Sequence, residues 1–261
     1  MPDLRAELEK ISREVGQFLK SERSSIAKSD IIFKGRANDL VSRADKEAEV
    51  MFVSALEKLI PESGFVAEEG TSQKIGAAYN WIIDPLDGTT NYLYGIPCYC
   101  TSVALQKGDD LILGVIYDPE RDECFSASTG EGAFLNGDPI HVSTETLAAH
   151  SLVATGFPYD NKGKQMAYLE VLANVNAATR GIRRLGSAAL DMAYVACGRF
   201  DAFYEYGLQP WDCAAGAVIV REAGGLITNF HGGEEFLKIR TMVCGNKAIH
   251  AALLPLLNFW E

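Results

Sequence analysis

Residues 80–91 of this chain read NWIIDPLDGTTN, an apolar run that ends in two carboxylates on either side of a proline. The apolar residues predict a buried strand, and the DPLDG segment predicts a turn directly after it. Because Pro85 locks its own φ angle, Asp84 and Asp87 are held in a fixed relation to each other. The stretch therefore predicts a strand that delivers two acids to one place.

Two helices are predicted before this strand and an antiparallel sheet after it. Apolar residues recur every three or four positions over roughly residues 3–27, and again from Ala44 to Leu59 before Pro61. Further along, apolar segments alternate with turn residues. The three clearest segments are Thr101–Lys107, Leu111–Tyr117 and Glu123–Ser128. Their close spacing predicts a meander of antiparallel strands.

After about residue 145 the pattern changes to alternating strands and helices. The strand-like stretches are Leu152–Thr155, Phe200–Tyr206, Leu226–Asn229 and Met242–Cys244. The helical stretches are 163–178, 187–197, 212–223 and 247–258. Such alternation predicts α/β layering. We expect an N-terminal α+β half over residues 1–145 and a C-terminal α/β half over residues 146–261, packed rigidly because no flexible linker joins them.

Composition favours an ordinary globular enzyme, since 48% of the 261 residues are hydrophobic. The N-terminus has no apolar core of signal-peptide type, and no apolar run approaches the roughly 18 residues that span a bilayer. We therefore expect a cytoplasmic protein with no membrane partner and with six reduced cysteines in its core. A soft-metal site at Cys98 and Cys100 is the alternative, but no His or Cys cluster adjoins them.

The formal net charge of −11 bears on possible partners. It argues against direct binding to a nucleic-acid backbone. It also means that an anionic substrate would need a local positive charge, which a divalent cation supplies.

Asp84 and Asp87 are the first candidate metal ligands. Two carboxylates held close together repel each other unless a cation lies between them, and magnesium prefers such hard oxygen ligands. The carbonyl of Leu86, in the same turn, is a further oxygen donor. If a helix starts at Gly88–Thr90, its free N–H groups would cradle a phosphate. The alternative is a purely structural turn in which Asp87 caps the helix.

Three further acids follow apolar runs or precede a helix. Glu68 and Glu69 end one apolar run, Asp212 precedes a helix of small residues, and Glu205 ends an apolar strand. Each has an alternative without function: a solvated loop for Glu68, an N-cap for Asp212 and a surface ion pair for Glu205. Metal binding is favoured only if the fold brings Glu68 and Asp212 beside Asp84.

Together these segments resemble the inositol monophosphatase family. The resemblance rests on WIIDPLDGTTN at 81–91, preceded by Glu68 and Glu69, and on WDCAAG at 211–216 followed by EAGG at 222–225. It covers nearly the whole chain, and both motifs are specific. The stretch GSAALDMA at 186–193 is similar to the bacterial inositol-1-monophosphatase branch. The resemblance implies a layered αβαβα sandwich of the inositol monophosphatase and fructose-1,6-bisphosphatase type.

The resemblance also implies a role for each site residue. Magnesium, as two or three ions for which manganese could substitute, would be bound by Glu68, Asp84, the Leu86 carbonyl, Asp87 and Asp212. Phosphate would be bound by the backbone N–H groups of Gly88, Thr89 and Thr90. The substrate's ring or hydroxyl groups would face Arg183, Ala188, Glu205 and Asp212. Asp45 would lie behind the direct ligands, on the side of the attacking nucleophile.

The expected reaction is in-line attack by water, because no Ser, Cys or His has the sequence context of a nucleophile. Glu68 would accept the proton of this water and the Thr89 hydroxyl would orient it. Asp87, with Asp84 and Asp212, would hold a magnesium that stabilises the leaving oxygen.

The predicted substrate is myo-inositol monophosphate or a similar polyol or sugar monophosphate. The alternatives are phosphatases of the same superfamily that act on fructose 1,6-bisphosphate, 3′-phosphoadenosine 5′-phosphate or histidinol phosphate. A non-catalytic regulatory protein of the same fold is a further alternative. The resemblance also implies a homodimer and inhibition by lithium.

Overall fold

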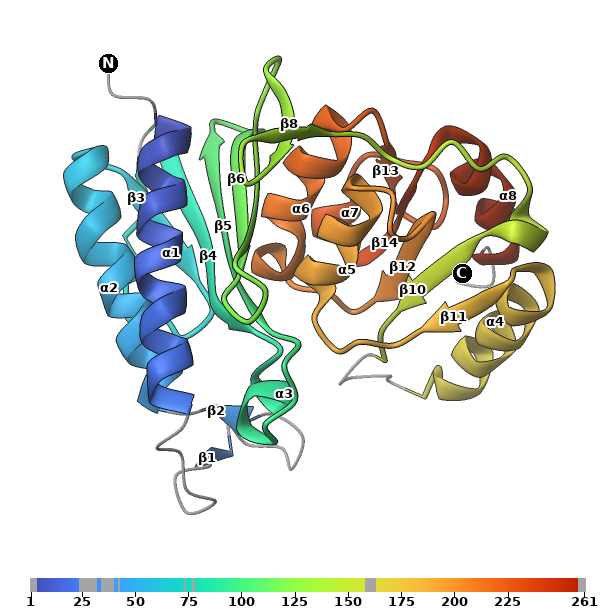
Figure 1. Ribbon diagram of the computed structural model, residues 1–261, viewed down its shortest axis with the longest axis horizontal. Coiled ribbons are helices and arrows are strands. Elements are labelled where there is room, and N and C mark those ends of the chain that lie inside the picture. The colour runs from blue at the N-terminus through green and yellow to red at the C-terminus, as the bar shows by residue number, and fades with distance from the viewer. Residues whose placement is uncertain are drawn as a thin grey trace.

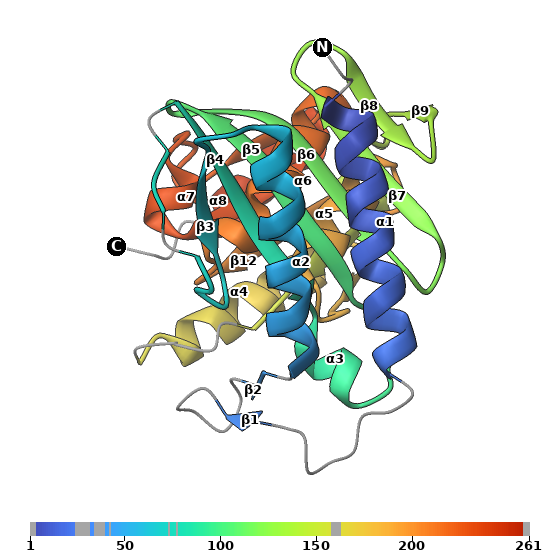
Figure 2. The same cartoon turned by 90° about the vertical axis from the view of Figure 1, so that its left-hand side faces the viewer.

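Five layers of helices and sheets make up the computed structural model, which describes residues 4–23, 32–33, 40–41, 43–72, 74–76, 78–157 and 163–257. The outer layer on one side holds α1 (Leu4–Arg23) and α2 (Arg43–Leu59), which run across the face of a seven-stranded sheet (Figures 1 and 2). The central layer holds α5 (Ala188–Ala196) and α6 (Pro210–Glu222). A five-stranded sheet follows, covered by α4 (Gln165–Ala178) and α8 (Lys247–Leu257). The predicted αβαβα architecture is confirmed.

The seven-stranded sheet contains the predicted meander. Its strands, in spatial order, are β3 (Gly64–Ala67), β4 (Tyr79–Asp87), β5 (Cys100–Lys107), β6 (Asp110–Asp118), β7 (Glu123–Ser128), β8 (Gly132–Leu135) and β9 (Asp138–Ile140). β3 pairs with β4 in parallel, and the pairs that follow are antiparallel. The strand predicted at residues 80–87 is therefore internal, between β3 and β5, which explains its continuous apolar character.

The five-stranded sheet is mixed. Its strands, in spatial order, are β11 (Gly181–Arg183), β10 (Leu152–Thr155), β12 (Ala202–Tyr206), β14 (Thr241–Gly245) and β13 (Leu226–Thr228). β10 pairs in parallel with β11 and β12, whereas β14 pairs antiparallel with β12 and β13. The shorter elements are β1 (Ile32–Phe33), β2 (Leu40–Val41), α3 (Thr89–Leu93), a 3₁₀ turn (Ala148–His150) and α7 (Phe236–Ile239).

Helix α1 shows why the sequence pattern works. Leu8, Ile11, Val15 and Leu19 are all buried against the sheet, as their spacing predicts. Gly16 lies on the same face, where a Cβ would come within 2.4 Å of the Tyr117 ring, so its lack of a side chain lets the helix approach β6.

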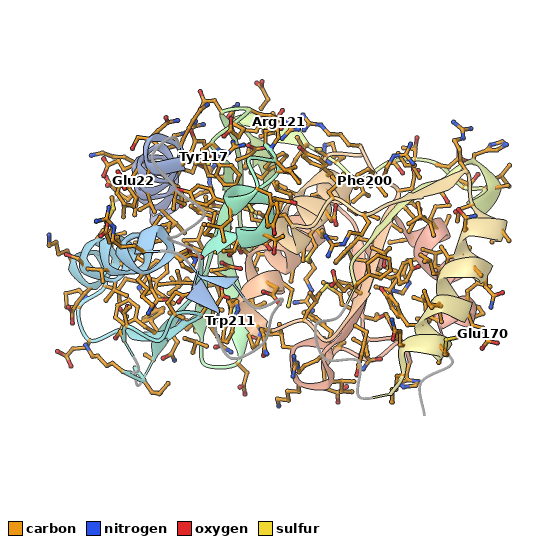
Figure 3. The ribbon with its side chains drawn as sticks, turned by 90° about the horizontal axis from the view of Figure 1, so that it is seen from below. Glu22, Tyr117, Arg121, Glu170, Phe200 and Trp211 are labelled. Carbon is orange, nitrogen blue, oxygen red and sulfur yellow. The ribbon has the colours of Figure 1, made fainter. Side chains whose placement is uncertain are left out.

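The central layer joins the two sheets closely. A Cβ on Gly114 of β6 would lie 2.5 Å from the carbonyl oxygen of Ala215 in α6, so glycine is needed for this approach. The Ser102 hydroxyl of β5 donates to the carbonyl of Trp211, 3.2 Å away. Figure 3 places Trp211 in the middle of the molecule and Glu170, on α4, at its far side. Helix α6 thus lies directly against the strands that carry the acids.

The predicted elements match the observed ones with differences at their ends. Residue 3 and residues 24–27 of the first predicted helix lie outside the described residues. Helix α6 starts at Pro210, two residues before its predicted start, because proline is well suited to a first helical turn. The short strands β8, β9 and β11 were not predicted, since three or four residues carry too little periodicity.

All six cysteines are free thiols, as predicted, and five of them are buried, whereas Cys197 is half-buried at the edge of the core. None of the helices in the described ranges is long and apolar enough to cross a membrane.

Candidate functional site

A bulge at the end of β4 sets the relation between Asp84 and Asp87. Asp84 pairs with Ser102 and Asp87 with Cys100, so three steps along β4 correspond to two along β5. Pro85 lies inside the bulge, where its missing N–H breaks the ladder without penalty. Asp84 Oδ1 accepts a hydrogen bond from Leu86 N at 3.0 Å, which fixes the carboxylate within the turn.

Glu68 follows β3 directly and is brought beside Asp84 by the parallel pairing of β3 and β4. Its N–H donates to the Ile83 carbonyl at 3.2 Å. The loop that follows is anchored by Glu49, a fully buried residue of α2, whose carboxylate accepts from Glu69 N at 2.7 Å and from Thr71 N at 2.6 Å. Helix α2 therefore positions the loop that carries Glu68.

Asp212 comes from the central layer. It is the third residue of α6, and Gln209, not Asp212, occupies the N-cap position. Asp212 Oδ2 accepts from Gln209 N at 2.6 Å, so its carboxylate turns back over the start of the helix. The close packing of α6 on β5 and β6 brings this carboxylate towards those of β4.

Electrostatic coupling shows that the four acids are neighbours. Burial raises the pKa of Asp84 well above its usual range, and the charges of Glu68, Asp87 and Asp212 raise it further. Burial likewise raises the pKa of Asp212, with the charge of Asp87 as the next cause. The pKa of Asp87 is raised to about 6 by burial, although hydrogen bonds from Ser187 and Ala189 oppose the rise.

Asp87 is also held by the second part of the chain. Its Oδ2 accepts from Ser187 Oγ at 2.6 Å and from Ala189 N at 2.7 Å. Ser187 is the N-cap of α5, and its hydroxyl also accepts from Leu190 N at 3.3 Å. One serine therefore caps a helix and orients a candidate ligand.

The acids fit a divalent cation by their chemistry. Among the residues that the structure describes, no group of three or more His, Cys, Asp or Glu side chains lies close enough together to coordinate a metal ion. The four acids would therefore have to move closer together to bind one. Their oxygens are nevertheless the hard donors that magnesium prefers. Burial and the charges of neighbouring acids disfavour the ionised forms of Asp84 and Asp212, and a divalent cation among the acids would reverse that effect.

The predicted phosphate cradle coincides with the start of α3. Gly88 is the N-cap of this helix with φ at 92°, a conformation that favours glycine, so Asp87 is not the cap. The Thr89 hydroxyl lies 3.1 Å from Asp45 Oδ1 and 3.0 Å from the Leu86 carbonyl oxygen. Asp45 is buried in α2 and so lies behind Thr89, as expected. Thr90 is exposed on α3.

A small pocket of about 70 Å³ opens beside the acids. It is lined by Asp87, Gly156, Phe157, Arg184, Gly186, Ser187, Ala188, Asp191, Glu205, Leu208 and Asp212. Burial raises the pKa of Glu205 to about 8, the charge of Asp87 raises it too, and Arg184 opposes the rise. Ala188 and Glu205, two of the predicted substrate contacts, thus line one pocket with Asp87 and Asp212.

Arg183 is not brought to this pocket. Its side chain is exposed, and its Nη1 donates to the carbonyl of the preceding Ile182 at 3.0 Å. Arg184 lines the pocket instead, with its guanidinium 5.7 Å from the centre of the Phe157 ring. The sequence offered no way to choose between two adjacent arginines.

A larger cavity, of about 440 Å³, lies elsewhere. Asp109 lines it from the turn before β6 and Asp110 from the first position of that strand. Arg221 and Glu222 line it from the end of α6, and Phe236 from α7. None of the predicted site residues lines it. The larger cavity therefore lies away from the residues that the sequence singled out.

Comparison with protein families matches residues 3–260 to the inositol monophosphatase family. The chain belongs to this family. It is 41% identical over 240 residues to an inositol-1-monophosphatase of Mesorhizobium japonicum, covering 92% of this chain and 90% of the relative. It is also 44% identical over 237 residues to Nus factor SuhB of Pseudomonas aeruginosa, covering 88% of each. The crystal structure of the extragenic suppressor protein suhB from Bartonella henselae superimposes with a TM-score of 0.93 at 40% identity, covering 98% of both chains.

Membership of the inositol monophosphatase family agrees with the resemblance seen in the motifs, but several site residues were missed by sequence reasoning. Glu49 and Asp191 are buried polar residues within α2 and α5, where nothing in the pattern distinguishes them from surface residues. Gly156 follows a strand as an ordinary loop glycine would. The signal that was available is the position of Asp191 inside the 186–193 segment that carried part of the resemblance.

Proposed function

We propose that this chain is a magnesium-dependent phosphatase that hydrolyses the monophosphate ester of a small polyol, with myo-inositol monophosphate as substrate. The observation that supports this most is the grouping of four acids at the ends of β3 and β4 and the start of α6: Glu68, Asp84, Asp87 and Asp212. Burial and the charges of neighbouring acids raise the pKa values of Asp84, Asp87 and Asp212. Burying several ionised carboxylates together lowers the free energy of unfolding unless a cation binds them. Family membership and the identity to an inositol-1-monophosphatase support the same reaction.

The proposed magnesium ligands are Glu68, Asp84, the Leu86 carbonyl, Asp87 and Asp212. When bound, magnesium supplies positive charge for the phosphate and activates water near neutral pH. Manganese would fit the same oxygen donors.

The protein's own groups bind and orient the substrate. The N–H groups of Gly88, Thr89 and Thr90 at the start of α3 would bind the phosphate oxygens. The Thr89 hydroxyl would orient the attacking water, and Glu68 would accept its proton. Ala188, Glu205 and Asp212 would face the alcohol portion in the pocket.

Direct attack by water fits the local thiol chemistry. Cys100 Sγ lies 4.0 Å from Asp87 Oδ2, but burial raises the pKa of this thiol well above its usual range. A neutral thiol is a weak nucleophile, so a covalent phosphocysteine is disfavoured.

We also propose a homodimer, a cytoplasmic location, inhibition by lithium and a division into halves at residue 145.

A second candidate function comes from the relatives named Nus factor SuhB, one of which is 44% identical to this chain. A Nus factor role could exist with or without the phosphatase activity. The phosphate-release experiment below separates these two cases.

The test is a phosphate-release assay with four substrates, each with magnesium and with EDTA. The substrates are inositol 1-phosphate, fructose 1,6-bisphosphate, 3′-phosphoadenosine 5′-phosphate and histidinol phosphate. We expect magnesium-dependent release, fastest from inositol 1-phosphate. Release from none of them would refute the phosphatase proposal, and rapid release from the nucleotide alone would refute the substrate.

Variants assign the roles within the site. Asp87→Asn should abolish turnover while the protein stays folded, whereas Asp109→Asn, at an exposed acid of a distant turn, should leave it unchanged. Glu68→Gln should lower kcat more than it raises KM, because a base acts in the transition state. A Glu68→Gln enzyme that lost only affinity would contradict the general-base role.

A further inference from the structure

Asp191 is a buried carboxyl group with an unsatisfied oxygen. It lies one turn into α5, its side chain is 1% exposed, and its Oδ1 has no hydrogen-bond partner in the part of the chain that the structure describes. It also lines the small pocket beside Asp87 and Glu205. Neither the metal ligands nor the phosphate cradle of the proposed function uses it.

The buried carboxyl group of Asp118, by contrast, is fully hydrogen-bonded. Asp118 accepts from Glu120 N at 2.9 Å, from Arg121 N at 3.2 Å and from Arg121 Nη1 at 2.8 Å. Since most buried polar atoms have a partner, an orphaned carboxyl oxygen on a residue that lines a pocket indicates a missing ligand. Groups kept at the expense of stability are typical of functional sites.

The surroundings of Asp191 suit an uncharged, hydroxyl-bearing ligand. The other charged residues that line the pocket are Glu205 of β12, Arg184 of the loop before α5, and Asp87 and Asp212. Asp87 and Asp212 are proposed magnesium ligands, so Arg184 is left with the carboxyls of Glu205 and Asp191, and no excess positive charge remains for a second phosphate. Carboxyl oxygens accept hydrogen bonds from hydroxyl groups, and a polyol offers several on neighbouring carbons.

The space for such a ligand depends on Gly156. A Cβ at this position would lie 2.1 Å from Glu205 Oε2, so only glycine leaves the carboxyl of Glu205 where it is. Gly156 and Asp191 come from different elements, and both line the pocket. Besides the proposed metal ligands Asp87 and Asp212, the pocket therefore has two acidic acceptors, Asp191 and Glu205, and a wall without a side chain.

We propose that Asp191 is a further substrate-binding residue, which together with Glu205 accepts hydrogen bonds from adjacent hydroxyl groups of the alcohol portion. The inference rests on the proposed phosphatase function and deepens it. It makes Asp191 a determinant of selectivity for polyhydroxylated leaving groups over simple alcohols or phenols. A site built to bind a hydroxyl group discriminates strongly against analogues that lack it.

The test compares inositol 1-phosphate with phenyl phosphate, whose alcohol portion is a benzene ring without any free hydroxyl group. Asp191→Ala should lower kcat/KM for inositol 1-phosphate by about tenfold or more and change that for phenyl phosphate by less than about twofold. Asp191→Asn retains a carbonyl acceptor and should recover part of the selectivity. Asp118→Asn is the matched buried control, and it should keep the wild-type ratio of the two substrates.

Thermal unfolding separates a binding role from a structural one. Removing an unsatisfied buried carboxyl should leave the Tm of Asp191→Ala at or above the wild-type value, whereas Asp118→Asn should lower it. If Asp191→Ala lowered kcat/KM equally for both substrates, so that their ratio stayed at the wild-type value, the inference would be overturned.

A binding measurement keeps the inference testable if the phosphatase proposal fails. In that case the wild type would release no phosphate from any substrate, and myo-inositol itself would be titrated into the protein and followed by NMR. An affinity about tenfold weaker in Asp191→Ala would support the inference. Equal affinities, or no binding to the wild type, would overturn it.

Discussion

Replacing Glu205 by glutamine should stabilise the metal-free protein, and more so as the pH rises. Glu205 is only 9% exposed, and burial raises its pKa from 4.5 to about 8. Between these two values the folded protein keeps this proton while the unfolded chain has lost it. The unfolded state then binds fewer protons, so this group lowers the free energy of unfolding as the pH rises through that window.

The size of the effect follows from the two pKa values. One pKa unit corresponds to about 1.4 kcal/mol, so the loss between pH 4.5 and pH 8 is about 5 kcal/mol at most for this group. Glutamine has nearly the same shape and no charge at any of these pH values. The variant should therefore lack this part of the slope, which reaches about 1.4 kcal/mol per pH unit near pH 6.

The assay is urea unfolding of the wild type and Glu205→Gln at five pH values between about 5 and 9, in EDTA so that no cation compensates the acids. The control is Glu170→Gln, at an exposed glutamate of α4 (Figure 3), which should follow the wild type at every pH. We expect the gap between Glu205→Gln and wild type to widen towards high pH. Parallel curves would refute the argument that burial holds this carboxyl neutral.

Two further substitutions test the contacts around the pocket. Ser187→Ala removes the N-cap of α5 and the 2.6 Å hydrogen bond to Asp87, so the free energy of unfolding should fall by about 1 to 3 kcal/mol. Ser187→Thr should recover most of that loss in the same urea experiment, and an unchanged stability of Ser187→Ala would contradict the double role of this hydroxyl. Gly156→Ala should displace the Glu205 carboxyl, which a new Cβ would approach to 2.1 Å. We expect a KM for inositol 1-phosphate at least about tenfold higher with little change in kcat, and an unaltered KM would show that Glu205 does not face the substrate.

Much of the fold could be predicted because its signals are local. The period of Leu8, Ile11, Val15 and Leu19 specifies one buried helix face, whatever that face packs against. The apolar run that ends at Asp84 specifies an internal strand, since both faces of β4 are covered. The candidate acids were likewise found by their motifs. Their predicted roles as metal ligands, phosphate binders and substrate contacts remain predictions until the variants are measured.

The pocket could not be predicted because its residues interact over long distances in the chain. Whether Arg183 or Arg184 faces the pocket depends on where β11 ends. Arg183 is its last residue and pairs with Ala154 of β10, whereas Arg184 follows in the loop before α5. In the sequence, Asp191 cannot be distinguished from an ordinary acid in the first turns of a helix. Only the structure shows that it is buried away from solvent.

The sequence alone thus determined the periodic helices, the internal strand and the acidic motifs, because propensity and hydrophobic spacing act between near neighbours. Only the tertiary structure decided which acids lie close enough to shift one another's pKa values and which acid lacks a hydrogen-bond partner. The reason is that burial and the interaction between charges arise only when α5 and α6 pack between the two sheets.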